Sequence, residues 1–294
     1  MNIVIFSAWR ADSQRTIKSI PINWHHKTMV VVPQDQLADY QKTIPKYFTL
    51  VAHDRYGIGN TKQWMLDNHD KFDQHVCMMD DDLDFTRRKD GKLVLANLSD
   101  MHEMFVMLSE WLREFAHVGI SLRAGNNTIA ESYIECARCI RVVGLDIKVA
   151  NEVGVRYDRT NGDMEDFDAT LQLLEAGYKN RVSYEFASGQ AATNTKGGVS
   201  TYRTHKTHTD AVKKLVQLHP GIVRMTTNKK SWAGLGKKKG RVDVIIRWKR
   251  AFRPRRTAAA RFNWGNYLEP VANQIKRTKP PLAKPKRRFD WGRK

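Results

Sequence analysis

The sequence predicts an α/β fold: a mostly parallel sheet with helices on both faces, followed by a basic C-terminal arm. Short β-branched apolar segments alternate with segments of helical spacing, a pattern typical of parallel strands connected by helices. The 294 residues carry a net charge of +19, and residues 224–294 hold 23 of the 50 Lys and Arg but 3 of the 31 Asp and Glu. We therefore expect a near-neutral globular domain over residues 1–223 and a basic extension over residues 224–294.

Four apolar segments early in the chain have the composition of buried strands, namely 2–7, 29–32, 49–52 and 75–79. The segments between them have helical spacing, namely 16–20, 36–44 and 62–68. In sheets of this kind, ligands bind beyond the carboxyl ends of the parallel strands. Motifs that directly follow these strands are therefore the first candidates for a functional site.

An amphipathic helix is predicted over Ser99 to Phe115, with Ser99 as its N-cap. Its Met and aromatic residues fall at helical spacing, which usually marks a face packed into the core rather than a binding surface. Further strands are expected at 118–122, 140–145, 182–186 and 242–248, together with a helix at 167–176 that ends before Gly177.

The composition argues against several classes of protein. Three cysteines in so long a chain do not make a disulfide scaffold, and Cys136-x-x-Cys139 lacks a second ligand pair at zinc spacing, so we expect reduced thiols. No segment approaches the roughly 18 consecutive apolar residues of a membrane-spanning helix. The apolar start runs into Arg10 and Asp12 without a cleavage-like segment, so we expect a cytoplasmic protein.

Three adjacent carboxylates, Asp80-Asp81-Asp82, follow the predicted strand 75–79. Adjacent carboxylates repel one another, so a cation or hydrogen-bond donors must compensate them. Because alternate side chains of an extended chain point the same way, we expect Asp80 and Asp82 to converge on Mg²⁺ or Mn²⁺, which in turn binds a diphosphate. The alternative interpretation is an acidic surface turn.

A second acidic cluster places Glu165 and Asp166 just before the predicted helix 167–176. Carboxylates at this position stabilise a helix through capping and its dipole, which is the simpler interpretation. The functional interpretation is that one of the two accepts a proton from an attacking hydroxyl. Further along, Arg203, His205 and His208 form either a solvated loop or a flap with a metal ligand and a cation for a leaving phosphate.

The turn Gly57-Ile58-Gly59-Asn60 lacks the spacing of the dinucleotide fingerprint and of the Walker loop. A Rossmann dehydrogenase and a P-loop ATPase are therefore both disfavoured. The glycines would instead let the backbone pass close to a nucleotide, with Asp54 and Arg55 just before them.

In their order, these motifs resemble the GT-A class of nucleotide-sugar glycosyltransferases: Ser7-Ala8-Trp9-Arg10, Asp54 to Asn60, Met78 to Asp82, and Glu165 to Asp168 leading into Leu171 to Tyr178. Within that class the chain is similar to the phage-encoded TET-associated glycosyltransferases, which are thought to decorate hydroxymethylated pyrimidines in DNA. The residues that carry this likeness are Gly125-Asn126-Asn127, Val155 to Asp158, and Gly197-Gly198 with Tyr202 to Thr204 and the two histidines.

The resemblance implies a GT-A-like fold and a nucleotide-sugar donor, with UDP as the expected nucleotide. It implies that Asp82 lies nearest a Mn²⁺ or Mg²⁺ ion, that Asp80 lies beside it and nearer the ribose, and that His205 or His208 is a third metal ligand. It also implies that Glu165 or Asp166 is the acceptor base, which favours inversion, although a retaining reaction would leave much the same composition. Donor contacts are expected from Ser7, Arg10, Asp54, Arg55, Gly59, Asn60, Asp80, Asp81 and Arg203.

The basic extension fits a polyanionic partner, because neutralising DNA phosphates releases counterions and favours binding. Aromatic residues interleave with its cations and offer surfaces for stacking on a base that is flipped out of the duplex. The alternatives are non-specific surface charge, an anionic membrane surface, or RNA. Candidate nucleic-acid contacts are Lys237, Lys238, Lys239, Arg247, Trp248, Lys249, Arg250, Arg253, Arg255 and Arg256.

The leading hypothesis is a metal-dependent hexosyl- or pentosyltransferase that modifies a hydroxymethyl-pyrimidine, with 5-hydroxymethylcytosine in phage DNA as the first candidate. One alternative is a GT-A glycosyltransferase that acts on a cell-surface glycan. Another is a nucleic-acid-binding protein whose GT-A-like domain has lost its chemistry. The sequence leaves the sugar, the modified base and the oligomeric state open.

Overall fold

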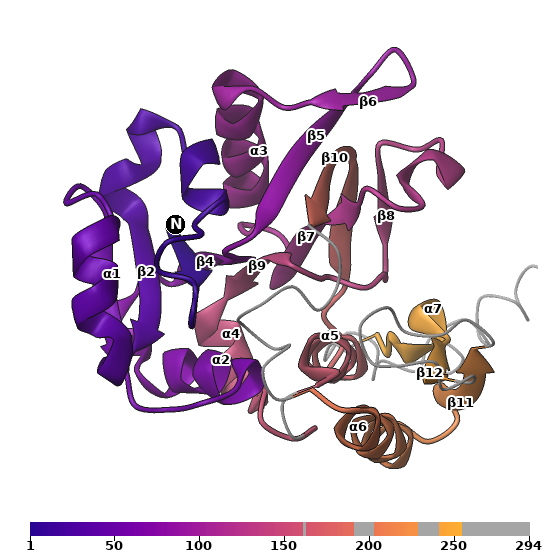
Figure 1. Ribbon diagram of the computed structural model, residues 1–294. Helices are drawn as coiled ribbons and strands as arrows, with labels where there is room; N and C mark the ends of the chain where they lie inside the picture. Colours follow the sequence, from indigo (N-terminus) through magenta and orange to yellow (C-terminus); the bar gives the residue numbers. More distant parts are fainter. Residues whose placement is uncertain (161–162, 191–202, 229–240, 255–294) are drawn as a thin grey trace, which may run out of the picture. The chain divides into compact units, whose positions relative to one another are not determined.

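The computed structural model describes residues 1–160, 163–190, 203–228 and 241–254 (Figure 1). Its packing divides the chain into the compact unit Met1–Pro254 and the segment Arg255–Lys294, which lies outside the described residues. The division by packing therefore falls further along the chain than position 223. The predicted division by function, at 223, stays a prediction.

Strands and helices alternate through most of the compact unit, with short 3-10 helices at Thr16–Ser19, Ile22–Lys27, Gln34–Gln36, His69–Lys71 and Asn126–Thr128. The described strands and α-helices are, in order, β1 (Asn2–Phe6), β2 (Thr28–Pro33), α1 (Leu37–Thr43), β3 (Thr49–His53), α2 (Ile58–Asp67), β4 (His75–Asp80), β5 (Leu83–Lys89), β6 (Lys92–Leu95), α3 (Leu98–Trp111), β7 (His117–Leu122), β8 (Tyr133–Glu135), β9 (Val142–Asp146), α4 (Ile147–Val153), α5 (Glu165–Glu175), β10 (Asn180–Gln190), α6 (His205–Leu218), β11 (Val223–Asn228), β12 (Arg241–Ile246) and α7 (Trp248–Ala251).

The central sheet has the strand order β3-β2-β1-β4-β9-β7-β10-β5-β6, and β8 pairs with β10. Strands β1 to β4 run parallel, as do β7 and β10. Strand β9 runs antiparallel between β4 and β7, and β5, β6 and β8 are also antiparallel to their neighbours. The predicted mostly parallel sheet is confirmed, while the hairpin β5–β6 was not anticipated.

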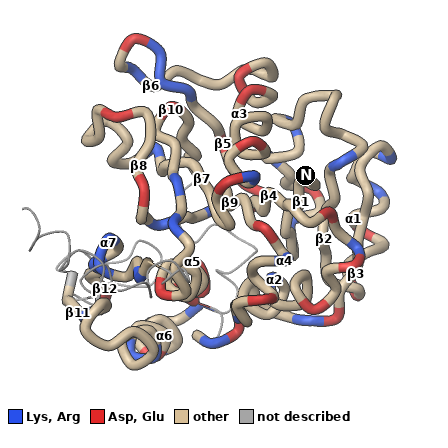
Figure 2. Tube along the Cα trace, turned by 180° about the vertical axis from the view of Figure 1, so that it is seen from behind, with Lys and Arg blue, Asp and Glu red and all other residues tan. Residues whose placement is uncertain are grey.

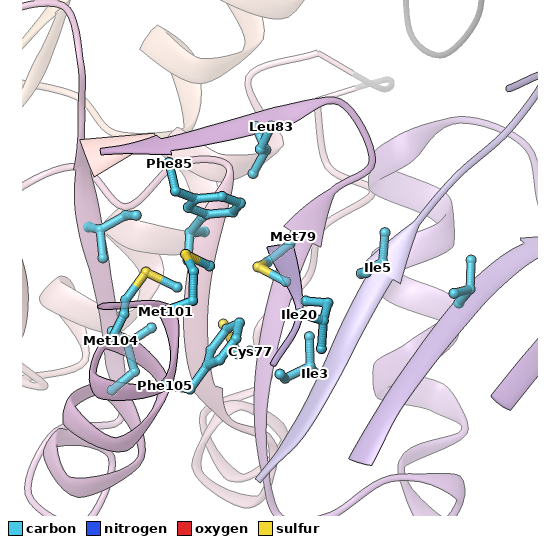
Figure 3. Packing of buried hydrophobic residues seen from close by; sticks show 14 of the residues in the cluster. Ile3, Ile5, Ile20, Cys77, Met79, Leu83, Phe85, Met101, Met104 and Phe105 are labelled. Carbon is cyan, nitrogen blue, oxygen red and sulfur yellow. The ribbon is translucent and has the colours of Figure 1, made fainter. Parts of the chain in front are cut away.

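Helices cover both faces of this sheet, as predicted. Along β1 and β4, alternate residues enter two different apolar clusters, because successive side chains of a strand point to opposite faces. One cluster joins Ile3, Ile5, Cys77 and Met79 to the Met and Phe side chains of α3 (Figure 3). The other cluster joins the remaining strand residues to α2, α4 and α5. The Met and aromatic face of α3 is therefore core.

Helix α3 begins earlier than predicted, because Asn97 and not Ser99 is its N-cap. The Asn97 side chain accepts from the backbone N–H of Asp100, and the Asp100 carboxylate accepts from the backbone N–H of Asn97. This reciprocal capping box satisfies two backbone donors at once, which a single serine cap would not do.

A third apolar cluster ties the end of the described chain to α5. The antiparallel pair of strands β11 and β12 packs with α6, and α7 packs against α5. The backbone N–H of Arg253 donates to the Leu174 carbonyl over 3.1 Å. The buried members include Leu171, Leu174, Ala211, Val212, Leu215, Val223 and Ala251. The described residues of β11, β12 and α7 therefore share one apolar cluster with α5, the helix that begins with Glu165 and Asp166.

The three cysteines, Cys77, Cys136 and Cys139, are free and buried, which confirms the expected thiols. Burial raises the pKa of Cys77 to about 12, so this thiol is held in its neutral form. Within the part of the chain that the structure describes, no helix has the length and apolar character needed to cross a membrane.

His219, just after α6, is buried between two carboxylates of α5. Its Nε2 lies 2.7 Å from Asp168 Oδ1 and its Nδ1 lies 3.0 Å from Glu175 Oε1. Burial alone would lower the pKa of His219, but hydrogen bonds and charge from Asp168 and Glu175 outweigh burial and raise the pKa. His219 therefore joins α6 to α5 through hydrogen bonds to two carboxylates, and these contacts favour its protonated form.

The His219→Gln variant tests how much the contacts of His219 with Asp168 and Glu175 stabilise the fold. Because the folded-state pKa of His219 is raised, its stabilising effect is complete below the unfolded-state pKa of about 6.5 and is lost as pH rises through the folded value. We expect the free-energy difference between wild type and variant to be larger near pH 6 than near pH 9, as measured by denaturant unfolding. An equal free-energy difference at both pH values would contradict a stabilising role for protonated His219.

Candidate active site

The candidate site lies where β1 and β4 end side by side, with Phe6 paired to Asp80 in the sheet. Asp80 is the last residue of β4, and Asp81 and Asp82 form the connection to β5. The backbone N–H groups of Arg15 and Thr16 both donate to the Asp81 carbonyl over 3.0 Å. The segment after β1 is thereby fastened along the acidic turn.

Asp81 anchors the loop that follows β1. Its Oδ2 accepts from Ser7 Oγ over 2.5 Å, and its Oδ1 accepts from Arg10 Nη1 over 2.7 Å. Burial raises the pKa of Asp81, while Ser7 and Arg10 counteract that rise. Ser7 also contacts Tyr40 and Gln14, so three elements meet at this carboxylate. The structure thus brings together Ser7, Arg10 and Asp81, which the sequence singled out.

Asp82 is held from two sides. Arg10 Nη1, which also contacts Asp81, donates to Asp82 Oδ2 over 2.9 Å. Gln190 Nε2 lies 2.8 Å from Asp82 Oδ1 and 2.9 Å from Oδ2. Gln190 is the last residue of β10 and carries no motif, so its role follows only from the register between β10 and β5, which pairs it with Leu83.

Asp80 differs from its two neighbours. Its carboxylate makes no hydrogen bond or ion pair with any residue that the structure describes, although its surroundings are desolvated. Desolvation raises the pKa of Asp80 to about 7; Lys62 opposes this rise, and Asp82, Asp81 and Glu165 add to it. Among the described residues, Asp80 is therefore a carboxyl group at the centre of the site that has no direct hydrogen-bond or ion-pair partner.

Glu165 forms a buried ion pair with Lys62 of α2, with Lys62 Nζ 2.9 Å from Glu165 Oε1. Desolvation lowers the pKa of Lys62, but Glu165 first and then Asp80 raise it, and their effect prevails. The same ammonium also interacts with Asp166. Lys62, which the sequence did not single out, therefore links the two acidic clusters electrostatically.

Gly59 allows this close packing at the start of α2. A β-carbon at this position would lie 2.6 Å from the Tyr157 carbonyl oxygen and 3.5 Å from Glu165 Cβ. Real β-carbons do not approach a backbone oxygen so closely. The sequence predicted close approach at this glycine, and the contact found is with the protein's own chain.

We expect Gly59→Ala to destabilise the fold by about 1–3 kcal/mol, because the backbone of α2 or of residue 157 must shift. Gly189→Ala is the matched control, since its β-carbon would lie 3.6 Å from Arg123 Cδ, an ordinary contact. Denaturant unfolding of both variants measures the difference. Equal stability of the two variants would show that the close approach of the Tyr157 carbonyl oxygen does not require a glycine at position 59.

Asp166 is oriented by an arginine. Arg138 donates from Nε over 2.9 Å and from Nη2 over 2.7 Å, both to Asp166 Oδ2. The guanidinium lies 3.5 Å from the centroid of the Phe167 ring. Phe167 in turn stacks on Trp248 of α7, with 6.0 Å between ring centroids. One stack of side chains therefore connects Asp166 to α7, which lies in the basic extension.

The predicted flap residues lie at the start of α6. Arg203 Nη2 is 3.0 Å from Asp163 Oδ1, and His208 Nδ1 is 2.7 Å from Asp163 Oδ2. His208 Nε2 lies 3.0 Å from the Val242 carbonyl oxygen, so both ring nitrogens are engaged. His205 is the first residue of α6. That His205 or His208 binds a metal stays a prediction, and the described residues contain no cluster of three or more metal-ligating side chains.

The predicted donor residues near α2 lie at its N-terminal end. Asp54 is exposed, Arg55 Nη1 is 2.7 Å from Asp67, and Asn60 Nδ2 donates to the Tyr56 carbonyl. Tyr56 is exposed and stacks on Trp9, which follows β1 with a left-handed backbone. This exposed aromatic pair was not among the predicted site residues.

The predicted nucleic-acid contacts fall partly outside the described residues, namely Lys237, Lys238, Lys239, Arg255 and Arg256. Four cations at and around α7 are described and exposed: Arg247, Lys249, Arg250 and Arg253. The trace at α7 is coloured blue for Lys and Arg in Figure 2. Trp248 is half-buried because it packs on Phe167.

Comparison with solved structures finds similarity at low identity. The crystal structure of S. aureus TarS 1–349 in complex with UDP-GlcNAc is 10% identical with a TM-score of 0.48, over 74% of this chain and 66% of that chain. The structure of GalNAc-T7 with UDP, GalNAc and Mn²⁺ is 9% identical with a TM-score of 0.42, over 65% of this chain and 44% of that chain.

Comparison with protein families gives a direct match. No curated protein matches the sequence. The family model of the TET-associated glycosyltransferases matches residues 1–198, a span that contains both acidic clusters and every strand of the central sheet. This match confirms the resemblance seen in the sequence motifs: the chain belongs to the TET-associated glycosyltransferase family.

Proposed function

We propose that this protein is a metal-dependent glycosyltransferase that moves a sugar from a UDP-sugar to a hydroxymethyl-pyrimidine, first of all 5-hydroxymethylcytosine, in DNA. The observation that carries the proposal is the meeting of two acidic clusters at one edge of the sheet in a chain of this family. The cluster Asp80-Asp81-Asp82 would bind a divalent cation, and Glu165 or Asp166 would accept a proton from the acceptor hydroxyl. Phage DNA in a bacterial cytoplasm would be the natural setting.

The acidic turn fits a hard divalent cation. Mg²⁺ and Mn²⁺ are commonly bound by one or two carboxylates, with phosphate and water oxygens completing the coordination. Asp80 has no partner among the described residues, and Asp82 keeps lone pairs beyond those that accept from Arg10 and Gln190. When bound, the cation would neutralise charge on the donor diphosphate.

The chain's own residues would divide the remaining work. Arg10 and Gln190 hold Asp82 in place, and Arg138 fixes Asp166 through one oxygen, which leaves Oδ1 without a hydrogen bond to any described residue. Asp166 Oδ1, or the second oxygen of Glu165, accepts the proton of the acceptor hydroxyl. The hydroxyl oxygen then bonds to the anomeric carbon as the diphosphate leaves with the electron pair. Attack opposite the leaving group inverts the anomeric centre.

The exposed cations around α7 support a DNA acceptor. They lie on the segment that packs against α5, the helix whose first residues are Glu165 and Asp166. DNA held there through its phosphates would lie near the proposed base. A cell-surface glycan as acceptor would leave these cations without a role.

The test of the function is a transfer assay. The purified protein is incubated with Mn²⁺, a panel of nucleotide-sugars, and one of three acceptors: DNA containing 5-hydroxymethylcytosine, DNA containing cytosine, or a cell-surface glycan. The masses of the digested nucleosides and of the glycan are measured by mass spectrometry. A sugar-sized mass gain confined to the modified DNA is expected. Transfer to glycan acceptors, with none to the modified DNA, would overturn the DNA acceptor.

The Asp82→Ala variant should lose at least about 100-fold in transfer rate, because losing several kcal/mol of charge stabilisation corresponds to that factor or more. Its DNA affinity should stay near that of wild type. Asp84→Asn is the matched control, since Asp84 pairs with Arg15 at the exposed surface. Full activity of Asp82→Ala would refute the metal site.

Neutralising Lys249, Arg250 and Arg253 to Gln in the full chain should weaken DNA binding and reduce its salt dependence. Each lost phosphate contact is expected to lower the slope of log K against log salt by about 0.9. Lys42, Lys46 and Lys148, which are also exposed, form the charge-matched control triple. Equal slopes for the two triples would show that α7 does not contact DNA phosphates.

A further inference from the structure

Almost every cation at the candidate site has a carboxylate partner. Arg10 pairs with Asp81 and Asp82, Lys62 with Glu165, Arg138 with Asp166, and Arg203 with Asp163. Arg141 is different, because its guanidinium makes no hydrogen bond or ion pair with any of the residues that the structure describes.

Arg141 is nonetheless held tightly at the centre of the site. It immediately precedes β9, and its carbonyl oxygen accepts from the backbone N–H of Asp80 over 3.2 Å. Its φ angle is +63°, in the left-handed region that side-chain-bearing residues rarely adopt. A strained backbone of this kind persists only when its surroundings enforce it, and such strain concentrates at ligand-binding positions.

The side chain of Arg141 lies among charges without being neutralised by any one of them. It is half-buried and interacts electrostatically with Asp80, Asp82 and Asp166, while Arg138 repels it. Desolvation is the main influence on the pKa of Arg141 and lowers it. A guanidinium offers five N–H donors in a planar fork, which matches carboxylate and phosphate oxygens.

Asp80 and Arg141 are thus adjacent residues of opposite charge, joined through their backbones, whose side chains do not pair with each other within 4 Å. Lys62 is the cation with the largest effect on the pKa of Asp80. A ligand that brings both a cation and an anion would satisfy the carboxylate and the guanidinium at once. A diphosphate bound to a divalent metal ion is such a ligand.

We propose that Arg141 binds an oxygen of the β-phosphate, the sugar-linked phosphate of the donor's nucleoside diphosphate, beside the position where Asp80 and Asp82 would hold a metal ion. The proposal rests on the proposed function for its donor class. As the bond from the anomeric carbon to the diphosphate breaks, negative charge accumulates on the diphosphate oxygens. Hydrogen bonds from Arg141 then strengthen, so this residue acts on the leaving group and not on the acceptor.

Two variants of Arg141 separate the role of its positive charge from the role of its planar guanidinium. Arg141→Asn removes the guanidinium with a residue type that tolerates a left-handed backbone, and Arg141→Lys keeps the charge but loses the fork. Arg113→Asn is the matched control, because Arg113 is exposed just after α3. Circular dichroism and thermal unfolding establish that each variant is folded.

Calorimetric titration with UDP and with UMP, each with Mn²⁺, is the deciding measurement. For Arg141→Asn we expect the affinity for UDP to fall about 10- to 100-fold, the loss of one or two charge-assisted hydrogen bonds, with an intermediate loss for Arg141→Lys. The affinity for UMP should fall much less, and DNA affinity and the Arg113→Asn control should be unchanged.

Other results would overturn the proposal in distinguishable ways. Unchanged UDP affinity in a folded Arg141→Asn variant would refute it. Loss of DNA affinity with UDP binding intact would assign Arg141 to acceptor phosphates instead. Wild-type protein that binds UDP with Mn²⁺ but transfers no sugar would refute the proposed function and leave the Arg141 contact standing, whereas wild type that binds no nucleoside diphosphate would refute both.

Discussion

The bifurcated contact of Arg10 with Asp81 and Asp82 is the interaction on which the candidate site depends. Three adjacent carboxylates at the end of a buried strand would repel one another, and burying them without partners would be costly. One guanidinium neutralises two of them, and Ser7 and Gln190 satisfy further lone pairs. The loop after β1 and the end of β10 are thereby drawn to the same point. The remaining carboxylate, Asp80, is left available because its neighbours are already compensated.

Helix α5 connects the candidate site to the C-terminal part of the described chain. Its first turn carries Glu165 and Asp166, each fixed by a cation from another element, while Asp168 and Glu175 clasp His219. The apolar side of α5 packs against α6, β11, β12 and α7. The proposed base lies on α5, and the exposed cations lie on and around α7, which packs against α5. The stack from Arg138 through Phe167 to Trp248 connects the two directly.

Much of this could be predicted from the sequence, because local pattern and composition decide it. The first four strands are apolar and β-branched, and the Asp run and the Glu165-Asp166 pair stand out by charge. The hairpin β5–β6 could not be predicted, because polar residues occupy much of it and Arg87 finds its partner Asp100 only in the fold. Lys62 and Gln190 were missed for a similar reason: each contacts a residue about 100 positions away, and only the strand register and helix packing determine that contact.

The antiparallel direction of β9 explains why Asp80 and Arg141, whose charged groups have no direct partner among the described residues, are neighbours. Had β9 run parallel to β4, its first residues would lie at the opposite edge of the sheet, far from the acidic turn. Because β9 runs antiparallel, the residue before it lies beside the last residue of β4, and the backbone bond from Asp80 to Arg141 records that contact. A reversed strand in an otherwise parallel region thus brings a cation to the edge where ligands of such sheets bind. The left-handed backbone of Arg141 is the local cost of turning the chain into that strand.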